Sequence, residues 1–354
     1  MTKRVAIICG GRSSEHEISC ISAGGVIAAI DRALYEPLLI GITKDGSWVL
    51  IPEGHSMQIK DGVLPVVPAG APKVVADISG FSAEGKSLNI DLVFPLLHGP
   101  YGEDGTIQGL LEMAGIAYVG SGVLASAVAM DKSFAKPIFA SHGIKTAPGV
   151  VVKKSEWQSD KASITKAVEA LGLPVFVKPA RGGSSRGTTK VKTIDALSAA
   201  ISEAHKFDPK AMIEKAITGA EIECAVLEVD GKPRASVIGQ IHIDSKFEFY
   251  DFEAKYLDGA TSIELPAPIS KAAADEIKAS AIKAFKALGC AGLARVDFFL
   301  TPSGEVIINE LNTMPGFTAT SVFPKMWAAS GVDYSKVITY LLKSAEARSN
   351  SVLS

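Results

Sequence analysis

The chain has 354 residues, of which 47% are hydrophobic and 21% are charged, and its formal net charge is −2. This length is too great for one compact core and predicts two or three domains, and the composition is that of a soluble α/β protein rather than a disordered or fibrous chain. The small net charge provides no general attraction for nucleic acid or for an anionic membrane, so any anionic ligand must be bound by local groups.

The cysteines and the first residues bear on where the protein works. Cys9, Cys20, Cys224 and Cys290 lack the spacing of a zinc site or of a disulfide framework. The start, MTKRVAIICGG, has a short apolar run that ends at a glycine pair, which is typical of a first strand rather than of a secretory signal. No apolar segment approaches the roughly 20 residues that span a bilayer. We therefore expect a cytoplasmic protein that binds neither membrane nor nucleic acid.

The first 130 residues predict an open, mostly parallel sheet covered by helices. The run RVAIIC is continuous and apolar, as a buried parallel strand is, and a helix is expected over residues 18–30. The runs YEPLLIGI and DLVFPLLHG repeat the strand pattern. A further helix is expected to begin at the cap Asp104 and to end at Gly115.

The pattern changes from about residue 145. Short β-rich runs alternate with glycine loops, in PVFVKP, AMIEKAI, EIECAVLEV and RASVIGQIHI, which predicts antiparallel sheets. One long amphipathic helix is expected over residues 271–288, ended by Gly289.

The segment GFSAEGKS, residues 80–87, matches the P-loop pattern letter for letter. A P-loop needs a strand before it and a helix after it, because the helix N-terminus and the loop amides hold the phosphates. The following residues, LNIDLVFPLL, have no helical period. We therefore expect a surface turn between two strands, and the GGRSSE segment after the first strand lacks the spacing of a dinucleotide site.

Two β-rich runs flank the turn sequence TPSG in GLARVDFFLTPSGEVIINELN. A loop of two or four residues places Leu300 opposite Glu305 and Arg295 opposite Glu310. In that register four polar residues share one face of the hairpin: Arg295, Asp297, Glu310 and Asn312. Carboxylate and amide oxygens suit Mg²⁺, so the face predicts a metal site shared with phosphate. The alternative is a solvated face with a salt bridge.

The segment PVFVKPARGGSSRGT places Lys178 on a strand before a loop rich in glycine and serine. Glycines let backbone amides approach phosphate closely and serine hydroxyls add donors, so the loop can cover a polyphosphate. An ordinary flexible hairpin loop is an equal alternative. In IEKAITGAE, the carboxylates of Glu214 and Glu221 can be ligand groups or plain surface charges.

Eight segments, in this order along the chain, resemble one protein family. They are CGGRSSEHEIS, LHGPYGEDGTIQG, YVGSGVLASAVAMDK, VKPARGGSSRG, IEKAITGAE, FYDFEAKY, ARVDFF and NELNTMPGFTATS. They span nearly the whole chain and are similar to segments of the ATP-grasp superfamily and, within it, of the D-alanine–D-alanine ligases. The resemblance implies an N-terminal open parallel α/β domain, Rossmann-like, followed by a two-part ATP-grasp fold.

The resemblance also implies an ATP site. Lys132 and Lys178 match the lysines that hold the phosphates, Lys255 would reach the γ-phosphate, and Ser185 lies in the covering loop.

The base and the ribose have their own group of matches. Glu214 and Glu221 match the acids that bind the adenine amino group and the ribose hydroxyls, while the backbone of Lys215 to Ile217 would frame the base.

The remaining matches concern the metals and the amino acids. Asp297, Glu310 and Asn312 match the ligands of two Mg²⁺ or Mn²⁺ ions, and Arg295 with the amide of Gly316 would face the reacting carbonyl.

The two D-alanines have further matching residues. Glu15 would orient the first ammonium, and Ser184 and Tyr256 would complete a hydrogen-bonded trio with it. Ser321 and the backbone at Val322 would hold the second carboxylate, and His98 would lie beside the first substrate.

The family resemblance implies ATP-dependent joining of two D-alanines through a D-alanyl phosphate, for peptidoglycan synthesis, by a homodimer with domains over residues 1–130, 131–218 and 219–354. A D-alanyl-D-lactate ligase is the near alternative, and Tyr256 in EAKY favours the dipeptide product. A P-loop regulator that uses GFSAEGKS is the distant one. Gly182 and Arg186 depart from the residues that many relatives carry in the covering loop.

Overall fold

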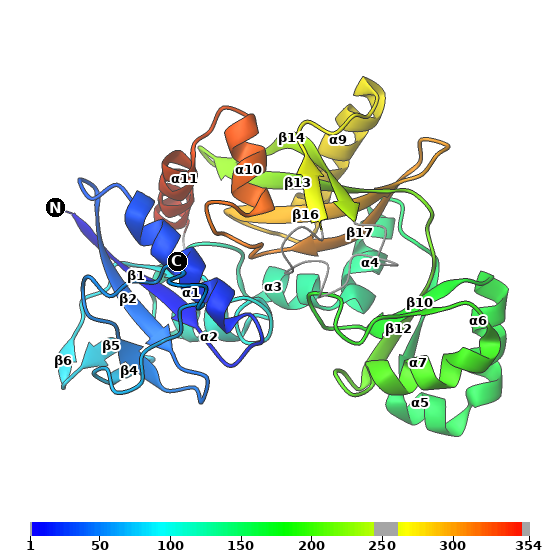
Figure 1. Cartoon of the computed structure of the whole chain (residues 1–354), viewed down its shortest axis with the longest axis horizontal. Coiled ribbons are helices and arrows are strands. Elements are labelled where there is room, and N and C mark those ends of the chain that lie inside the picture. Colours follow the sequence, from blue (N-terminus) through cyan, green and yellow to red (C-terminus); the bar gives the residue numbers. More distant parts are fainter. Residues whose placement is uncertain (1, 244–260, 349–354) are drawn as a thin grey trace.

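The computed structural model describes residues 2–243 and 261–348, and it contains three main β-sheets that follow one another along the chain (Figure 1). Lys255 and Tyr256 lie outside the described residues.

The first sheet has the strand order β3-β2-β1-β7-β8. Its strands are β1 (Lys3–Gly10), β2 (Tyr35–Ile42), β3 (Trp48–Leu50), β7 (Leu92–Pro95) and β8 (Ala117–Tyr118). Four of them are parallel neighbours, and only the edge strand β3 runs antiparallel to its neighbour β2. The central strand β1 is buried from Val5 to Gly10, which explains its unbroken apolar run. The predicted open, mostly parallel sheet is confirmed.

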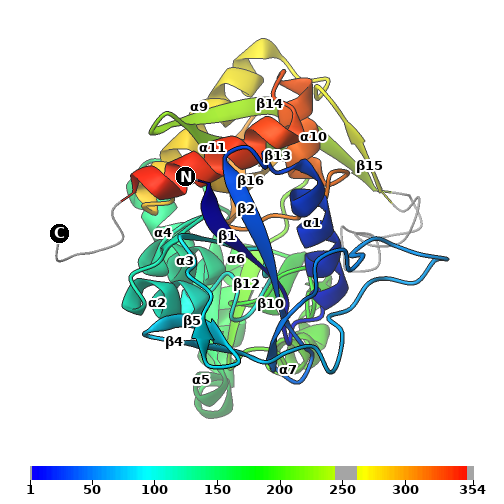
Figure 2. The same cartoon turned by 90° about the vertical axis from the view of Figure 1, so that its left-hand side faces the viewer.

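Alternate residues of β1 enter two different cores. Ile7 packs in a core with α1 (His16–Ala29) and with the C-terminal helix α11 (Tyr334–Ala347), whereas Ile8 packs in a core with α2 (Thr106–Met113). Figure 2 shows α11 lying across the N-terminal sheet. The last helix of the chain therefore ties the first sheet to the C-terminal part. The helix that was expected from a cap at Asp104 has Gly105 as its N-cap residue, and an Asp104 carboxylate oxygen accepts a hydrogen bond from the Thr106 amide at 3.0 Å.

The P-loop-like segment forms a hairpin. Its strands β5 (Gly80–Ala83) and β6 (Lys86–Ser87) pair antiparallel, and β4 (Val74–Asp77) completes a small sheet. Glu84 and Gly85 connect the two strands with φ values of 50° and 74°, the left-handed conformation of a tight hairpin turn. No helix follows, so the prediction of a turn is confirmed and the P-loop is excluded.

The second sheet is antiparallel and has the order β11-β10-β12-β9. It comprises β9 (Gly149–Lys153), β10 (Val175–Pro179), β11 (Thr189–Val191) and β12 (Lys210–Lys215), with α5 (Lys154–Ser159), α6 (Lys161–Leu171), the 3-10 helix Ile194–Ala196 and α7 (Leu197–Ala204) beside it. Val175, Val177 and Ile213 pack in its core. Phe176, Lys178 and Glu214 alternate with them, so these side chains belong to the opposite face.

The third sheet is also antiparallel, with the order β15-β14-β13-β16-β17. It comprises β13 (Ala220–Val229), β14 (Lys232–Ile243), β15 (Thr261–Glu264), β16 (Leu293–Leu300) and β17 (Val306–Asn312). The long helix α9 (Lys271–Ala287) packs against it with α4 (Lys132–Ser141), which follows α3 (Val123–Met130), and α10 (Val322–Ala329) follows the last strand. The predicted long helix is confirmed, with Gly289 just beyond its end in the left-handed conformation.

Candidate active site

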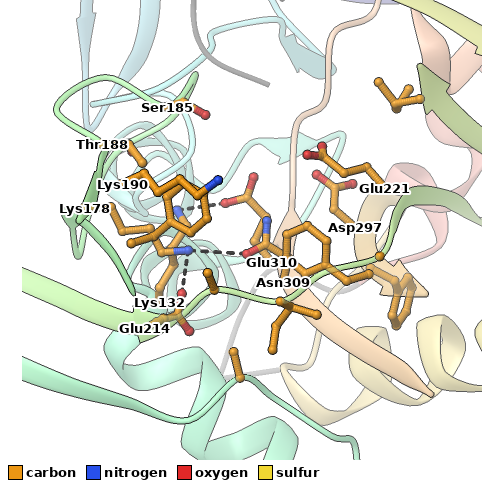
Figure 3. Close-up of a pocket in the computed structure, with 18 of the residues that line it drawn as sticks. Lys132, Lys178, Ser185, Thr188, Lys190, Glu214, Glu221, Asp297, Asn309 and Glu310 are labelled. Atoms are coloured by element: carbon orange, nitrogen blue, oxygen red, sulfur yellow. Dashed lines mark hydrogen bonds and ion pairs between the residues drawn. The ribbon is translucent and has the colours of Figure 1, made fainter. Parts of the chain in front are cut away.

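A cavity of about 540 Å³ lies between the second and third sheets (Figure 3). It is within the usual size of a small-molecule site. Its walls come from strands β10, β12, β13, β16 and β17 and from the glycine- and serine-rich loop over residues 182–188. Apolar side chains such as Phe176, Ile217 and Phe298 share this lining with Lys132, Lys178 and several carboxylates. The cavity therefore offers both an apolar slot and a strongly charged region.

The start of α4 is fixed to the second sheet by its backbone. The Lys132 amide donates a hydrogen bond to the Ala180 carbonyl just after β10, at 3.0 Å. Asp131 caps the helix by accepting from the Ser133 amide at 3.0 Å, and its carboxylate also pairs with Lys210. Lys132 and Lys136 are one helical turn apart, so α4 presents two ammonium groups on the same face.

Glu214 is the acceptor for two lysines, the buried Lys136 and the partly buried Lys178. Its carboxylate pairs with Lys136 through one oxygen and with Lys178 through the other, at 2.6 Å in the second case. Burial acts to raise the pKa of Glu214, but the charges of Lys178 and Lys136 outweigh it and lower the pKa to about 2. Burial lowers the pKa of Lys136 to about 8, so both partners are charged at neutral pH.

Lys132 connects the third sheet with the covering loop. Its ammonium lies 2.8 Å from a Glu310 carboxylate oxygen and donates to the Gly182 carbonyl at 2.9 Å. Burial acts to lower the pKa of Lys132, but Glu310, together with the charges of Glu214 and Asp297, outweighs burial and the pKa is raised. Figure 3 shows Lys132 and Lys178 side by side, next to Glu310 and Glu214.

The hairpin of β16 and β17 has a different register from the predicted one. Five residues, 301–305, connect the two strands, and Gly304 occupies the left-handed conformation at φ 84°. Leu300 therefore pairs with Val306 instead of Glu305. A β-bulge between Asp297 and Phe298 then shifts the pairing once more, so that Asp297 pairs with Glu310. The predicted pairing of Arg295 with Glu310 is wrong by two positions.

The two shifts together leave Asp297 and Glu310 on the same face of the hairpin, as the predicted metal site requires. Because side chains alternate along a strand, two one-residue shifts return Glu310 to the side of Asp297. The bulge leaves Asn309 without a partner across the strand, and both Asn309 and Glu310 line the cavity. Asn309 accepts a hydrogen bond from Lys178 at 3.3 Å, so two successive residues of β17 serve two different lysines.

A second charged group lies on the same hairpin. Arg295 donates two hydrogen bonds of 2.8 Å to Asp297, and its guanidinium is 3.3 Å from Glu223 on β13. The Asn312 side-chain amide donates to Asp297 at 3.1 Å. The structure thus brings the four predicted hairpin residues together and adds Glu223, which the sequence reasoning missed.

The predicted metal ligands all lie on the hairpin of β16 and β17. Among residues 2–243 and 261–348, no group of three or more His, Cys, Asp or Glu side chains could hold a metal ion. Asp297 and Glu310 are direct cross-strand partners, and Asn312 is bonded to Asp297. Two carboxylates and an amide fit Mg²⁺, which takes few protein oxygens and completes its shell with water and substrate phosphates.

The loop over residues 182–188 contacts the segment between β1 and α1. Ser184 donates a hydrogen bond of 3.0 Å to Glu15, and Ser184 and Ser185 both have positive φ, at 52° and 54°. Such a conformation is unusual for serine and persists only where the surroundings hold it. Two members of the predicted hydrogen-bonded trio, here called the latch, are therefore in contact, while the third, Tyr256, lies outside the described residues.

The loop after β17 brings several other predicted residues together. His98 is 4% exposed, and its Nδ1 lies 3.0 Å from the Met314 carbonyl. Ser321 precedes α10, with Val322 as the first helical residue, and a Cβ added to Gly316 would lie 3.2 Å from the Ser321 hydroxyl oxygen. Gly316 and Ser321 thus lie close together.

Glu103 also belongs to this region, although the sequence reasoning did not select it. Its carboxylate accepts hydrogen bonds from the Gly99 amide at 2.6 Å and from the Met314 amide at 3.3 Å. Burial and the charge of Glu15 raise the pKa of Glu103 to about 8. This carboxyl group joins the loop of His98 to the loop of Gly316.

Comparisons with known proteins identify the family of the chain. The family model described as D-ala D-ala ligase N-terminus matches residues 4–121, and the one described as D-ala D-ala ligase C-terminus matches residues 138–343. The chain belongs to the D-alanine–D-alanine ligase family. Ligases of this family act with ATP and a divalent metal on small molecules.

Individual family members are similar over almost their full length. The D-alanine–D-alanine ligase of Paenarthrobacter aurescens is 50% identical, over 98% of this chain and 95% of its own, and that of Streptomyces griseus is 47% identical, over 99% and 94%. The chain is an ATP-dependent D-alanine–D-alanine ligase that serves peptidoglycan synthesis.

Solved structures of the family have the same architecture. The VanG D-Ala:D-Ser ligase from Enterococcus faecalis superposes with a TM-score of 0.86 at 37% identity, over 98% of this chain and 100% of its own. The D-alanine-D-alanine ligase from Coxiella burnetii gives 0.83 at 33%, over 97% and 94%. The expected ATP-grasp fold is confirmed. No helix in the described part of the chain is long and apolar enough to cross a membrane.

Proposed function

We propose that the cavity between the second and third sheets holds ATP and that the joining of two D-alanines takes place at its mouth. The observation that carries this proposal is the meeting of Lys132 and Lys178, from different elements, with the carboxylates Asp297 and Glu310 in a single cavity. Paired cations and oxygen ligands are what phosphoryl transfer needs, because it depends on positioning and on neutralisation of charge.

Lys132 and Lys178 would donate to phosphate oxygens, with Ser185 of the covering loop above them and Lys255 as a third cation. The loop over residues 182–188 would exclude water, because an acyl phosphate is destroyed by hydrolysis.

The base and the ribose would occupy the part of the cavity that begins at Glu214, next to Lys178, and continues to Glu221. The backbone of Lys215 to Ile217 would frame the base, Glu214 would face the adenine amino group, and Glu221 would accept from the ribose hydroxyls. All of these residues line the cavity, which supports the assignment.

Asp297, Glu310 and Asn312 would hold two Mg²⁺ or Mn²⁺ ions. The ion pairs described above join four cationic side chains (Lys132, Lys136, Lys178 and Arg295) to four carboxylates (Glu214, Glu223, Asp297 and Glu310). A region so balanced does not neutralise the several negative charges of ATP, and burying unpaired charge is costly. Divalent ions that enter with the nucleotide would supply the missing positive charge and, when bound, would polarise the transferred phosphoryl group.

The chain's own groups would position the amino acids. Glu15, bonded to Ser184, would accept from the first ammonium with Tyr256 completing the latch, and His98 would lie beside this substrate. Arg295 and the Gly316 amide would stabilise the oxyanion that forms when the second amine attacks the D-alanyl phosphate.

The N-terminus of α10 would receive the second D-alanine. Ser321 and the backbone at Val322 would bind its carboxylate, since the first turn of a helix presents unpaired amides to an anion.

Two further proposals concern organisation. We assign domains over residues 1–130, 131–218 and 219–354, which the separate sheets support. We also propose a cytoplasmic homodimer, and measurement of the molar mass in solution by light scattering tests the dimer.

The experiment that tests the proposed function is release of phosphate from ATP and Mg²⁺ with different amino acids. D-Alanine alone should give phosphate and the dipeptide in equal amounts, and L-alanine should give neither. Strong release only when D-lactate or D-serine is added to D-alanine would show that the enzyme makes a different product.

A further inference from the structure

Lys136 is a buried cation that the proposed chemistry does not use. It is 4% exposed, lies on the same face of α4 as Lys132, and is absent from the residues that line the cavity. Its ammonium contacts Glu214, which does line the cavity. The direct contact of Lys136 with the cavity lining is therefore the one with Glu214, among the ion pairs of the described residues.

Glu214 is held on three sides. Its two carboxylate oxygens meet Lys136 and Lys178, and on the neighbouring strand β9 Gly149 lies so close that an added Cβ would approach the Glu214 Cγ to 3.1 Å and the Ile213 carbonyl to 2.7 Å. The Glu214 side chain is thus held in one orientation, as a group that binds a ligand selectively must be.

The two lysines differ in what else they can contact. Lys178 lines the cavity and is the proposed phosphate lysine, so its charge is shared with the nucleotide when ATP is bound. Lys136 pairs with Glu214 and is not among the residues that line the cavity. In the ATP complex, Lys136 is the cation that remains dedicated to Glu214.

We infer that Lys136 determines the preference for adenine over guanine nucleotides, by keeping Glu214 an ionised acceptor at the base end of the cavity. This inference rests on the proposed function, which places the base beside Glu214.

The hydrogen-bonding groups of adenine and guanine determine which nucleotide should be favoured when Lys136 is lost. Adenine presents an amino group, a donor, at the position where guanine presents a carbonyl, an acceptor. A carboxylate accepts from the amino group and repels the carbonyl oxygen. When the lysine is removed, a buried Glu214 gains a proton more readily, and the protonated acid can donate to the guanine carbonyl. Loss of Lys136 therefore favours GTP relative to ATP.

The test compares kcat/KM for ATP and for GTP in phosphate release with D-alanine. The ratio of kcat/KM for ATP to kcat/KM for GTP should fall about 10- to 100-fold in Lys136→Met. This is the range expected when a hydrogen bond to a charged group is lost. Lys136→Arg keeps the positive charge and should keep the ratio within about threefold of the wild type.

A matched control separates this effect from the loss of any lysine. Lys145 forms an exposed ion pair with Glu305 at 2.9 Å, so Lys145→Met should change neither the ratio nor the activity. If Lys136→Met does not fold, as judged by circular dichroism, Lys136→Gln is measured in its place.

A double-mutant cycle identifies the route through Glu214. Glu214→Gln should lower the ratio by itself, and Lys136→Met should then add nothing. A ratio that stays at the wild-type value in Lys136→Met, with equal losses for ATP and GTP, would show a merely structural lysine and overturn the inference. Failure of the wild type to release phosphate with ATP and D-alanine would instead refute the proposed function.

Discussion

The acid stability of the protein should depend on Glu214. Its pKa of about 2 in the folded state lies roughly 2.5 units below the ordinary value of 4.5, and each unit corresponds to about 1.4 kcal/mol. A carboxyl group with a lowered folded pKa stabilises the protein above its unfolded pKa, and this stabilisation is lost as pH falls towards the folded pKa. The ionised Glu214 should therefore contribute about 3 kcal/mol at pH 7, of which about 2 kcal/mol is lost by pH 3.

Lys136 does not contribute to the change of stability between pH 7 and pH 3. Burial lowers its pKa to about 8, so it stays protonated from pH 3 to pH 7 and contributes no change of stability there. Above pH 8 the deprotonation of Lys136 changes the stability in the same direction as the ionisation of Glu214 does at low pH, because a lysine with a lowered folded pKa also makes folding more favourable as pH rises.

The assay is urea unfolding of the wild type and of Glu214→Gln at several pH values between 7 and 3. Glu214→Gln should be less stable than the wild type at pH 7, because the buried Lys136 and the partly buried Lys178 lose their partner. The difference in the free energy of unfolding should narrow by about 2 kcal/mol at pH 3. Glu305→Gln, which affects an exposed pair, serves as the control. Parallel pH profiles for the wild type and Glu214→Gln would refute the reasoning.

Three further predictions concern activity. Lys86→Ala should leave phosphate release near the wild-type rate, because Lys86 is exposed on a hairpin. Lys178→Ala should abolish phosphate release. The opposite pattern would support the P-loop hypothesis. Arg295→Met should lower kcat about 10²- to 10³-fold, the usual cost of one oxyanion donor, and an unchanged kcat would exclude that role. Ser184→Ala removes the bond to Glu15 and should raise KM for D-alanine more than KM for ATP, which initial rates at varied substrate will show.

Much of the fold could be predicted from local patterns in the sequence. The apolar run of β1, the amphipathic helix α9 and the antiparallel alternation of β10 and β12 were all predictable, because each depends on a period of a few residues. The GFSAEGKS hairpin was predictable for the same reason, since no helical period followed it.

The register of the β16 and β17 hairpin was not predictable from its residues. The turn sequence TPSG allows more than one loop length, and the bulge at Asn309 has no signature in VIINELN. The same face was reached only because two unforeseen shifts add to an even number.

Contacts between segments that lie far apart in the sequence could not be predicted either. A spacing of four residues in MDKSFAK shows that Lys132 and Lys136 share a helix face, but not that Glu214, 78 positions further on, meets the second of them. Glu103 and Glu223 were missed because their partners come from other elements. The covering of the first sheet by α11 likewise depends on packing that no local pattern encodes.

The most direct test of the central claim is a crystal structure with ADP and Mn²⁺, recorded at the manganese absorption edge. We expect anomalous peaks beside Asp297, Glu310 and Asn312, with the phosphates next to Lys132 and Lys178 and the base beside Lys215 to Ile217. Nucleotide bound elsewhere, or manganese away from Asp297 and Glu310, would contradict the account.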